Sequence, residues 1–76
     1  MSKTQEQAQK LLGEVIRKNR KAQNLSQERF ADQVGVHRTY MGAIERGERN
    51  ISLMNILRIA SALNIKPSEL FAQSKM

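Results

Sequence analysis

The most regular feature of the chain is the recurrence of apolar residues every three or four positions, the spacing of amphipathic helices. The first such stretch runs from about residue 5 to residue 24, and its inner face carries Ala8, Leu12, Val15, Ile16 and Asn19. Gly13 lies inside this stretch, where it either marks the close approach of another backbone or is simply tolerated. Asn24 follows and can adopt the left-handed conformation that often closes a helix.

Capping residues divide the rest of the chain into shorter helices. Ser26 and Ser52 are suitable N-caps, because a serine hydroxyl accepts a hydrogen bond from a backbone N–H of the first turn. Gly35 and Gly47 are expected to end helices, and Pro67 suits the first position of the last one. The helices so predicted cover about 27–34, 37–46, 53–63 and 67–72. No stretch keeps the alternating apolar pattern of a strand, so we expect an all-α fold.

The second and third predicted helices are joined by so short a turn that they form a helix–turn–helix unit over residues 26–46. Two helices of this length cannot bury a core by themselves, so the flanking helices must hold the pair rigid. We therefore predict one compact five-helix domain over residues 16–72. Residues 1–15 are expected to form an N-terminal tail and the start of the first helix, and residues 73–76 a C-terminal tail.

The charge of the chain favours a polyanionic partner. Lysine and arginine number 13 against 7 aspartates and glutamates, a net charge of +6, and such an excess suggests nucleic acid before a membrane surface. A generally solvated basic surface is the alternative. The chain has one tyrosine and two phenylalanines, which argues against single-strand binders, because these need several aromatic stacking platforms.

Other classes of function find little support in the sequence. Cysteine is absent, so a thiolate metal site is excluded, and the absence fits a reducing, cytoplasmic location. His37 is the only histidine, and no serine stands in a recognisable catalytic arrangement with it, so we expect neither a metal site nor an enzyme. No apolar run approaches the roughly 20 residues needed to cross a bilayer. No cofactor and no small-molecule ligand are expected.

Several short motifs stand in a particular order along the chain from Ile16 onward, and they are Ser26-Gln27, Phe30-Ala31, Gly35-Val36, Ile44-Glu45-Arg46-Gly47 and Leu70-Phe71. Together, at this spacing, they resemble the helix-turn-helix domain of the Xre/Cro family, the five-helix fold of lambda-type phage repressors. The tract HRTY at 37–40, followed by IERGERN at 44–50, is similar to the controller proteins of restriction–modification systems, which are small dimeric members of the family. Other Xre-type regulators share this tract, so the controller role is one of several that it fits.

The resemblance implies a sequence-specific transcriptional regulator, either a repressor or an activator. Its recognition helix, at about 37–46, would lie in the major groove of a pseudo-palindromic operator in double-stranded DNA. The alternative is an antitoxin or another protein-interaction module of the same fold. A toxin-binding antitoxin often has an extra segment, whereas this chain stops soon after Phe71, so we expect the regulator.

Residues near the start of the recognition helix are the ones that reach base edges. Arg38 stands there, and an arginine can pair with O6 and N7 of guanine through two hydrogen bonds. Thr39 can contact a base edge or a thymine methyl group, and Ala43 offers an apolar contact beside Gly42 on the exposed face. We therefore predict base contacts by Arg38, Thr39 and Ala43.

A second group of residues is expected to contact the DNA backbone. His37 would lie near phosphate at the helix N-terminus. Tyr40 suits a phosphate, a pyrimidine–purine step sensed through its shape, or a partly buried place in the core. The resemblance implies a phosphate contact for Gln27 at the start of the preceding helix. It also implies that the end of the recognition helix and the following loop grip the backbone through Arg46, Arg49 and Asn50.

The resemblance gives Glu45 an inward role. A carboxylate facing DNA would be repelled, and in the family the matching glutamate is held by an arginine of the first helix. Arg20 stands at that position, so an Arg20–Glu45 ion pair is expected to lock the recognition helix to the first helix. Two exposed charges of little consequence are the alternative.

The C-terminal third has more apolar residues than so small a core can bury. We expect an isologous homodimer through the fourth helix, the loop after it and the fifth helix, with a monomer that pairs only on DNA as the alternative. The predicted interface residues are Leu53, Leu57, Ile65, Leu70 and Phe71, with Met54 as a further candidate.

Overall fold

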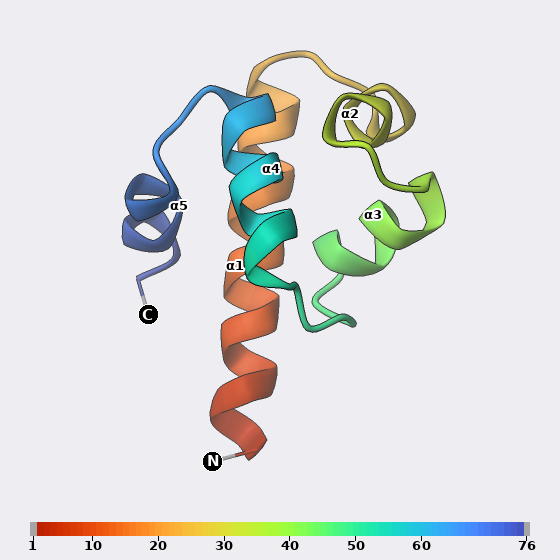
Figure 1. The fold of residues 1–76 in the computed structure, drawn as a ribbon. Helices are drawn as coiled ribbons and strands as arrows, with labels where there is room; N and C mark the ends of the chain where they lie inside the picture. The colour runs from red at the N-terminus through yellow and green to blue at the C-terminus, as the bar shows by residue number, and fades with distance from the viewer. Residues whose placement is uncertain (1, 76) are drawn as a thin grey trace.

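The computed structural model describes residues 2–75, and this part of the chain contains five α-helices and no strand (Figure 1). They are α1 (Ser2–Ala22), α2 (Gln27–Val34), α3 (Arg38–Glu45), α4 (Leu53–Leu63) and α5 (Pro67–Ser74). The all-α, five-helix prediction is confirmed, and the bounds of α2 and α4 are those predicted. α3 is shorter than predicted at both ends, because His37 and Arg46 are its flanking caps.

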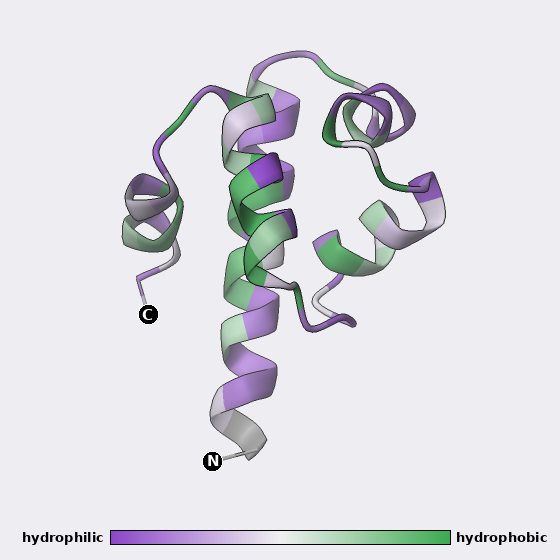
Figure 2. Cartoon of the chain, in the orientation of Figure 1, coloured by the Kyte–Doolittle hydropathy of each residue, from purple (hydrophilic) through white to green (hydrophobic). Residues whose placement is uncertain are grey.

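α1 is the longest helix and forms the axis of the domain, with α3, α4 and α5 packed against it (Figure 1). α2 packs on α3 and α4, so the helix–turn–helix pair lies on one side of α1 and α5 on the other. Apolar segments are concentrated on α4 and the middle of α1, while the turns of α1 that follow its grey first turn are mostly hydrophilic (Figure 2). The largest fully buried side chains are Phe30, Ile16, Met41, Ile44, Ile59, Leu63 and Leu70.

The serine N-caps of α2 and α4 are those that the sequence predicts. The Ser26 hydroxyl accepts a hydrogen bond from the backbone N–H of Arg29 at 3.1 Å. The Ser52 hydroxyl accepts one from the backbone N–H of Asn55, also at 3.1 Å. Each bond satisfies one of the unpaired N–H groups of a first helical turn, so α2 and α4 begin at definite residues.

Residues with positive φ follow all five helices, and they are Asn24, Gly35, Gly47, Asn64 and Lys75. The first three stand at the positions predicted to end helices. After three of these turns comes an apolar residue that packs against the core: Leu25, Val36 and Ile65. The backbone N–H of each of these three bonds back to a carbonyl of the preceding helix. The left-handed turn therefore satisfies the end of a helix and also directs an apolar side chain inward.

α3 approaches α1 so closely that two positions have room only for glycine. A Cβ on Gly13 would overlap the carbonyl oxygen of Ile44 and lie 2.9 Å from that of Glu45. A Cβ on Gly47, where φ is +75°, would lie 2.7 Å from the Cα of Lys10. Of the two interpretations of Gly13, the structure shows the close approach, since the backbones of α1 and α3 are in direct contact there.

The helices extend further toward both ends of the chain than the sequence predicts, and Met1 and Met76 lie outside the described residues. The first helix, predicted from about residue 5, begins at Ser2, and its first half contributes Leu12 to the core. At the other end, the predicted tail at 73–76 is helical as far as Ser74, which is buried and whose hydroxyl lies 2.8 Å from the carbonyl oxygen of Phe71. Polar contacts of this kind leave no trace in an apolar periodicity, which explains the second error.

Candidate nucleic-acid interface

The predicted base-contact residues lie on the part of α3 that faces away from the core. Arg38 and Thr39 are exposed at the start of α3, and Ala43 is half-buried further along. The opposite face of the helix buries Met41 and Ile44 completely. Because residues i and i+4 lie on one side of a helix, Thr39 and Ala43 are neighbours. We refer to Arg38, Thr39 and Ala43 as the outer strip of α3.

Gly42 does not belong to the outer strip, contrary to the prediction that it lies on the exposed face. It is buried, and a Cβ there would lie 3.1 Å from Nη1 of Arg46 and 3.2 Å from Oε1 of Gln27. Successive helical residues are rotated by about 100°, so the neighbour of an exposed position can face inward. The missing side chain of Gly42 leaves room for Gln27 against α3.

His37 is the N-cap of α3, a role that the sequence prediction had left out. Its Nδ1 accepts a hydrogen bond from the backbone N–H of Thr39 at 3.1 Å. The position of His37 just before the helix is that of an N-cap, but histidine is not among the residues usually preferred at N-caps. Because Nδ1 is used by this hydrogen bond, Nε2 is the ring nitrogen that the cap leaves unused.

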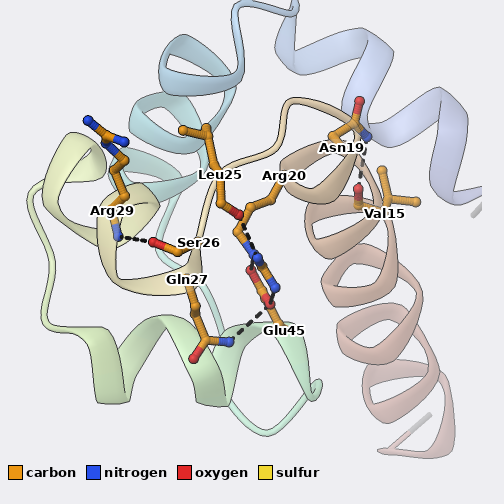
Figure 3. Close-up of polar contacts among 8 residues, drawn as sticks. All are labelled: Val15, Asn19, Arg20, Leu25, Ser26, Gln27, Arg29 and Glu45. Atoms are coloured by element: carbon orange, nitrogen blue, oxygen red, sulfur yellow. Dashed lines mark hydrogen bonds and ion pairs between the residues drawn. The ribbon is translucent and has the colours of Figure 1, made fainter.

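The structure contains the Arg20–Glu45 ion pair, and both side chains are buried (Figure 3). Nε of Arg20 donates to Oε2 of Glu45 at 2.7 Å, and Nη2 donates to Oε1 at 3.0 Å. Nη1 of Arg20 donates to the carbonyl oxygen of Leu25 at 2.8 Å. Nε2 of Gln27 donates to Oε1 of Glu45 at 3.1 Å. Two parallel hydrogen bonds from a guanidinium to a carboxylate fix the relative orientation of their helices.

This cluster joins α1, the entry into α2 and the end of α3 (Figure 3). In the part of the chain that the structure describes, no buried side-chain nitrogen or oxygen lacks a hydrogen-bond partner, so the buried charges are compensated. Gln27 uses one N–H of its side-chain amide for Glu45, and the second N–H makes no hydrogen bond among the described residues. The cluster also keeps the carboxylate of Glu45 away from the outer strip.

The basic residues beyond α3 are engaged within the protein. Nε of Arg46 donates to Oε2 of Glu48 at 3.0 Å, and this hydrogen bond raises the pKa of Arg46 and lowers the pKa of Glu48. The guanidinium carbon of Arg49 lies 4.9 Å from the centroid of the Tyr40 ring, which is within the range of a cation–π interaction. Asn50 is exposed in the loop after α3, where it borders a hollow lined by residues of α1, α4 and α5.

A groove beside α3 brings basic residues of α1 to the candidate interface. Its lining consists of Lys10, Glu14, Arg17, Gln27, Gly42, Glu45 and Arg46. The sequence analysis gives Lys10 no role, although its spacing along α1 indicates where it lies. Lys10 stands three positions before Gly13, and Arg17 stands three positions before Arg20. Gly13 and Arg20 both face α3. Residues at that spacing share one side of a helix, which places the two cations beside α3.

The residues predicted for a dimer interface do not all lie at the surface. The exposed ones are Leu53 (70%), Met54 (58%), Leu57 (41%) and Phe71 (40%). Ile65 is half-buried against the core. Leu70 is completely buried, so its assignment to an interface is wrong. α5 turns Leu70 and Ser74, four residues apart, toward the core and leaves Phe71 outward.

Within residues 2–75, no three histidine or acidic side chains are grouped so that they could hold a metal ion. None of the helices described there has the length and hydrophobicity that crossing a membrane requires.

A family model described as helix-turn-helix matches residues 16–70, which include the outer strip and the ion pair. The chain belongs to the helix-turn-helix family. The family prediction is confirmed, and with it the prediction that the chain is a DNA-binding transcriptional regulator.

This helix-turn-helix regulator is similar to several bacterial control proteins. Control protein C.SmaI of Serratia marcescens is 43% identical over 63 residues, which cover 83% of this chain and 75% of the relative. Control protein C.BamHI of Bacillus amyloliquefaciens is 46% identical over 61 residues, 79% of this chain and 75% of the relative. The restriction-modification controller protein C.AhdI of Aeromonas hydrophila has a crystal structure that matches with a TM-score of 0.80 and 50% identity, over 82% of this chain and 94% of that one. These relatives are regulators rather than enzymes, and they favour regulation over the antitoxin alternative.

We expect Glu45→Gln to lower the free energy of unfolding by about 3–5 kcal/mol, because the buried charge of Arg20 loses its partner. Glu48→Gln is the matched control, since Glu48 also accepts a hydrogen bond from an arginine but both side chains of that pair are exposed. Exposed pairs contribute little. Urea unfolding followed by circular dichroism measures both variants, and equally small effects would show that the Arg20–Glu45 pair does not hold α3.

Proposed function

We propose that this helix-turn-helix regulator is a controller protein that acts in the bacterial cytoplasm, as a homodimer, on a pseudo-palindromic operator. The observation that carries the proposal is the outer strip, because α3 is fixed to α1 through Glu45 and still exposes Arg38 and Thr39. The similarity to C.SmaI, C.BamHI and C.AhdI supports the controller role. The net charge of +6 supports attraction to the DNA backbone.

In the proposed complex, α3 enters the major groove with the outer strip toward the bases. Arg38 pairs with O6 and N7 of a guanine, and Thr39 and Ala43 contact a base edge or a thymine methyl group. His37 supports this geometry, because its cap holds the first turn of α3 while Nε2 is free to donate to a phosphate.

Backbone contacts flank the outer strip on two sides. On one side, Gln27 and Arg46 line the same groove as Lys10 and Arg17 of α1, and cations together with an amide donor suit phosphate oxygens. On the other side lie Tyr40 and Arg49, whose ring and guanidinium are stacked. Such contacts set the position of α3 on the duplex and leave sequence reading to the outer strip.

A dimer follows from the small reach of a single recognition helix. A pseudo-palindrome needs two copies of α3, with half-sites about 34 Å apart. The exposed Leu53, Met54 and Leu57 of α4 offer the apolar surface for an isologous contact. A groove beside them, between α2 and α4, includes Val34 and Ala62, so the partner's apolar side chains have a place to pack.

Selection of bound sequences from random DNA tests the base contacts. We expect a pseudo-palindromic motif with the natural chain, and loss of discrimination at one base of each half-site with Arg38→Ala, worth about 1–3 kcal/mol per contact. Arg29→Ala is the control, because Arg29 is an exposed arginine of α2 outside the outer strip. A uniform loss of affinity with an unchanged motif in Arg38→Ala would reduce Arg38 to a backbone contact.

Sedimentation at low micromolar concentration tests the dimer. The natural chain should sediment at twice its 8.7 kDa mass, and Leu57→Glu should sediment as a monomer, because a carboxylate cannot be buried in an apolar interface without a partner. Leu11→Glu is the control, since Leu11 of α1 is about as exposed as Leu57 (38% and 41%) but lies outside the proposed interface. A natural chain that sediments at 8.7 kDa would contradict the proposal.

A further inference from the structure

Tyr40 is anchored by two elements that lie outside the helix–turn–helix unit. Its ring is half-buried against the core, and its hydroxyl oxygen lies 3.2 Å from Nδ2 of Asn55 on α4. Arg49, in the loop between α3 and α4, covers the ring with its guanidinium. Asn55 is itself fixed, because its backbone N–H bonds to the Ser52 cap. The start of α3 is therefore held to α4, as its end is held to α1.

The direction of the hydrogen bond between Tyr40 and Asn55 follows from a third residue. Nη1 of Arg58 lies 3.4 Å from Oδ1 of Asn55, and a guanidinium can only donate. The amide oxygen of Asn55 must therefore face Arg58, which turns the NH₂ group toward Tyr40. An amide NH₂ can only donate as well, so the tyrosine oxygen accepts, and its own proton remains unused by any hydrogen bond among the described residues.

The unused proton belongs to a side chain at the edge of the candidate interface. The guanidinium of Arg49 stacks on the same ring, and a stacked guanidinium keeps N–H donors at its rim. A hydroxyl proton and a cation so placed suit a phosphate oxygen, and a hydrogen bond to a charged acceptor is stronger than one between neutral groups. A base acceptor would fit less well, because Tyr40 lies beside the outer strip rather than on it.

We propose that Asn55 is a positioning residue for DNA binding: oriented by Arg58, it holds the Tyr40 hydroxyl as an acceptor, so that the tyrosine donates its proton to a DNA phosphate. The inference rests on the proposed function, and it gives α4 a part in recognition besides dimerisation. It predicts a contact that adds affinity equally at all operator sequences, because a phosphate carries no base identity.

The first test is a double-mutant cycle on the motif selected by the natural chain. Tyr40→Phe and Asn55→Ala should each weaken binding about ten-fold, the effect of one hydrogen bond to a charged group. The double variant should be no weaker than Tyr40→Phe alone, because without the Tyr40 hydroxyl Asn55 has nothing to position. Losses that multiply would overturn the inference. Circular dichroism checks that each variant is folded at the titration temperature.

The second test reverses the hydrogen bond at nearly constant size. In Asn55→Asp the new carboxylate can only accept, so it takes the Tyr40 proton away from the phosphate while keeping its partner Arg58. The added negative charge also weakens binding, and the same substitution in the Tyr40→Phe background measures that effect alone. We expect the loss to be larger in the natural background by about the same ten-fold factor.

The outcomes separate the inference from the function on which it rests. An equal loss from Asn55→Asp in both backgrounds overturns the inference, while the natural chain still binds its motif. A natural chain that selects no motif overturns the proposed function and the inference together. Arg49→Ala should reduce the slope of log affinity against log salt, whereas Asn55→Ala should leave that slope unchanged, because no cation is lost.

Discussion

Arg20 on α1 and Glu45 at the end of α3 are joined by two hydrogen bonds of 2.7 and 3.0 Å in a place that water hardly reaches. Gln27 and the Leu25 carbonyl complete their hydrogen bonding. A buried pair of this kind adds little net stability, since desolvation costs about as much as the attraction returns. The pair instead favours one orientation of α3 relative to α1, because any other orientation would leave a buried charge without its partner. The backbone contact at Gly13 works in the same direction, since it lets α1 and α3 touch at the same point.

DNA binding requires that α3 is held in one position by the rest of the domain while its outer strip stays accessible. Its end is tied to α1 by Glu45, and its start is tied to α4 by Tyr40 and capped by His37. Between these anchors the helix buries one face and leaves the outer strip exposed. A side chain that contacts a base must be held at a defined position. A helix fixed at both ends provides that position with little loss of conformational entropy on binding.

Local chemistry made much of this fold predictable. Serine caps, left-handed turn residues and apolar spacing act over a few positions, so the bounds of α2 and α4 followed from the sequence. The Arg20–Glu45 pair spans 25 positions and came from the family resemblance rather than from periodicity. For two adjacent residues of similar character, the sequence pattern does not show which one faces the core. Gly42, beside Ala43, and Leu70, beside Phe71, are the buried members of such pairs.

Polar contacts between distant segments were the least predictable features. Asn19 and Gln73 bond across 54 positions, and Asn55 reaches Tyr40 across 15. Amide side chains occur throughout surfaces, so nothing in the sequence marks the few that find a partner in the fold. The extension of α5 to Ser74, beyond the predicted helix end at about residue 72, has the same origin.

The central claim is that the ion pair orients α3 for recognition, and replacing the pair by apolar residues tests it most directly. In the double variant Arg20→Met, Glu45→Leu the buried charges disappear together, so the free energy of unfolding should be retained or raised. Affinity for the selected motif and for unrelated DNA would be measured with this variant and with the natural chain. We predict that the ratio of the two affinities falls about ten-fold or more while binding to unrelated DNA persists. A stable variant whose ratio stays within about two-fold of the natural value would contradict the account.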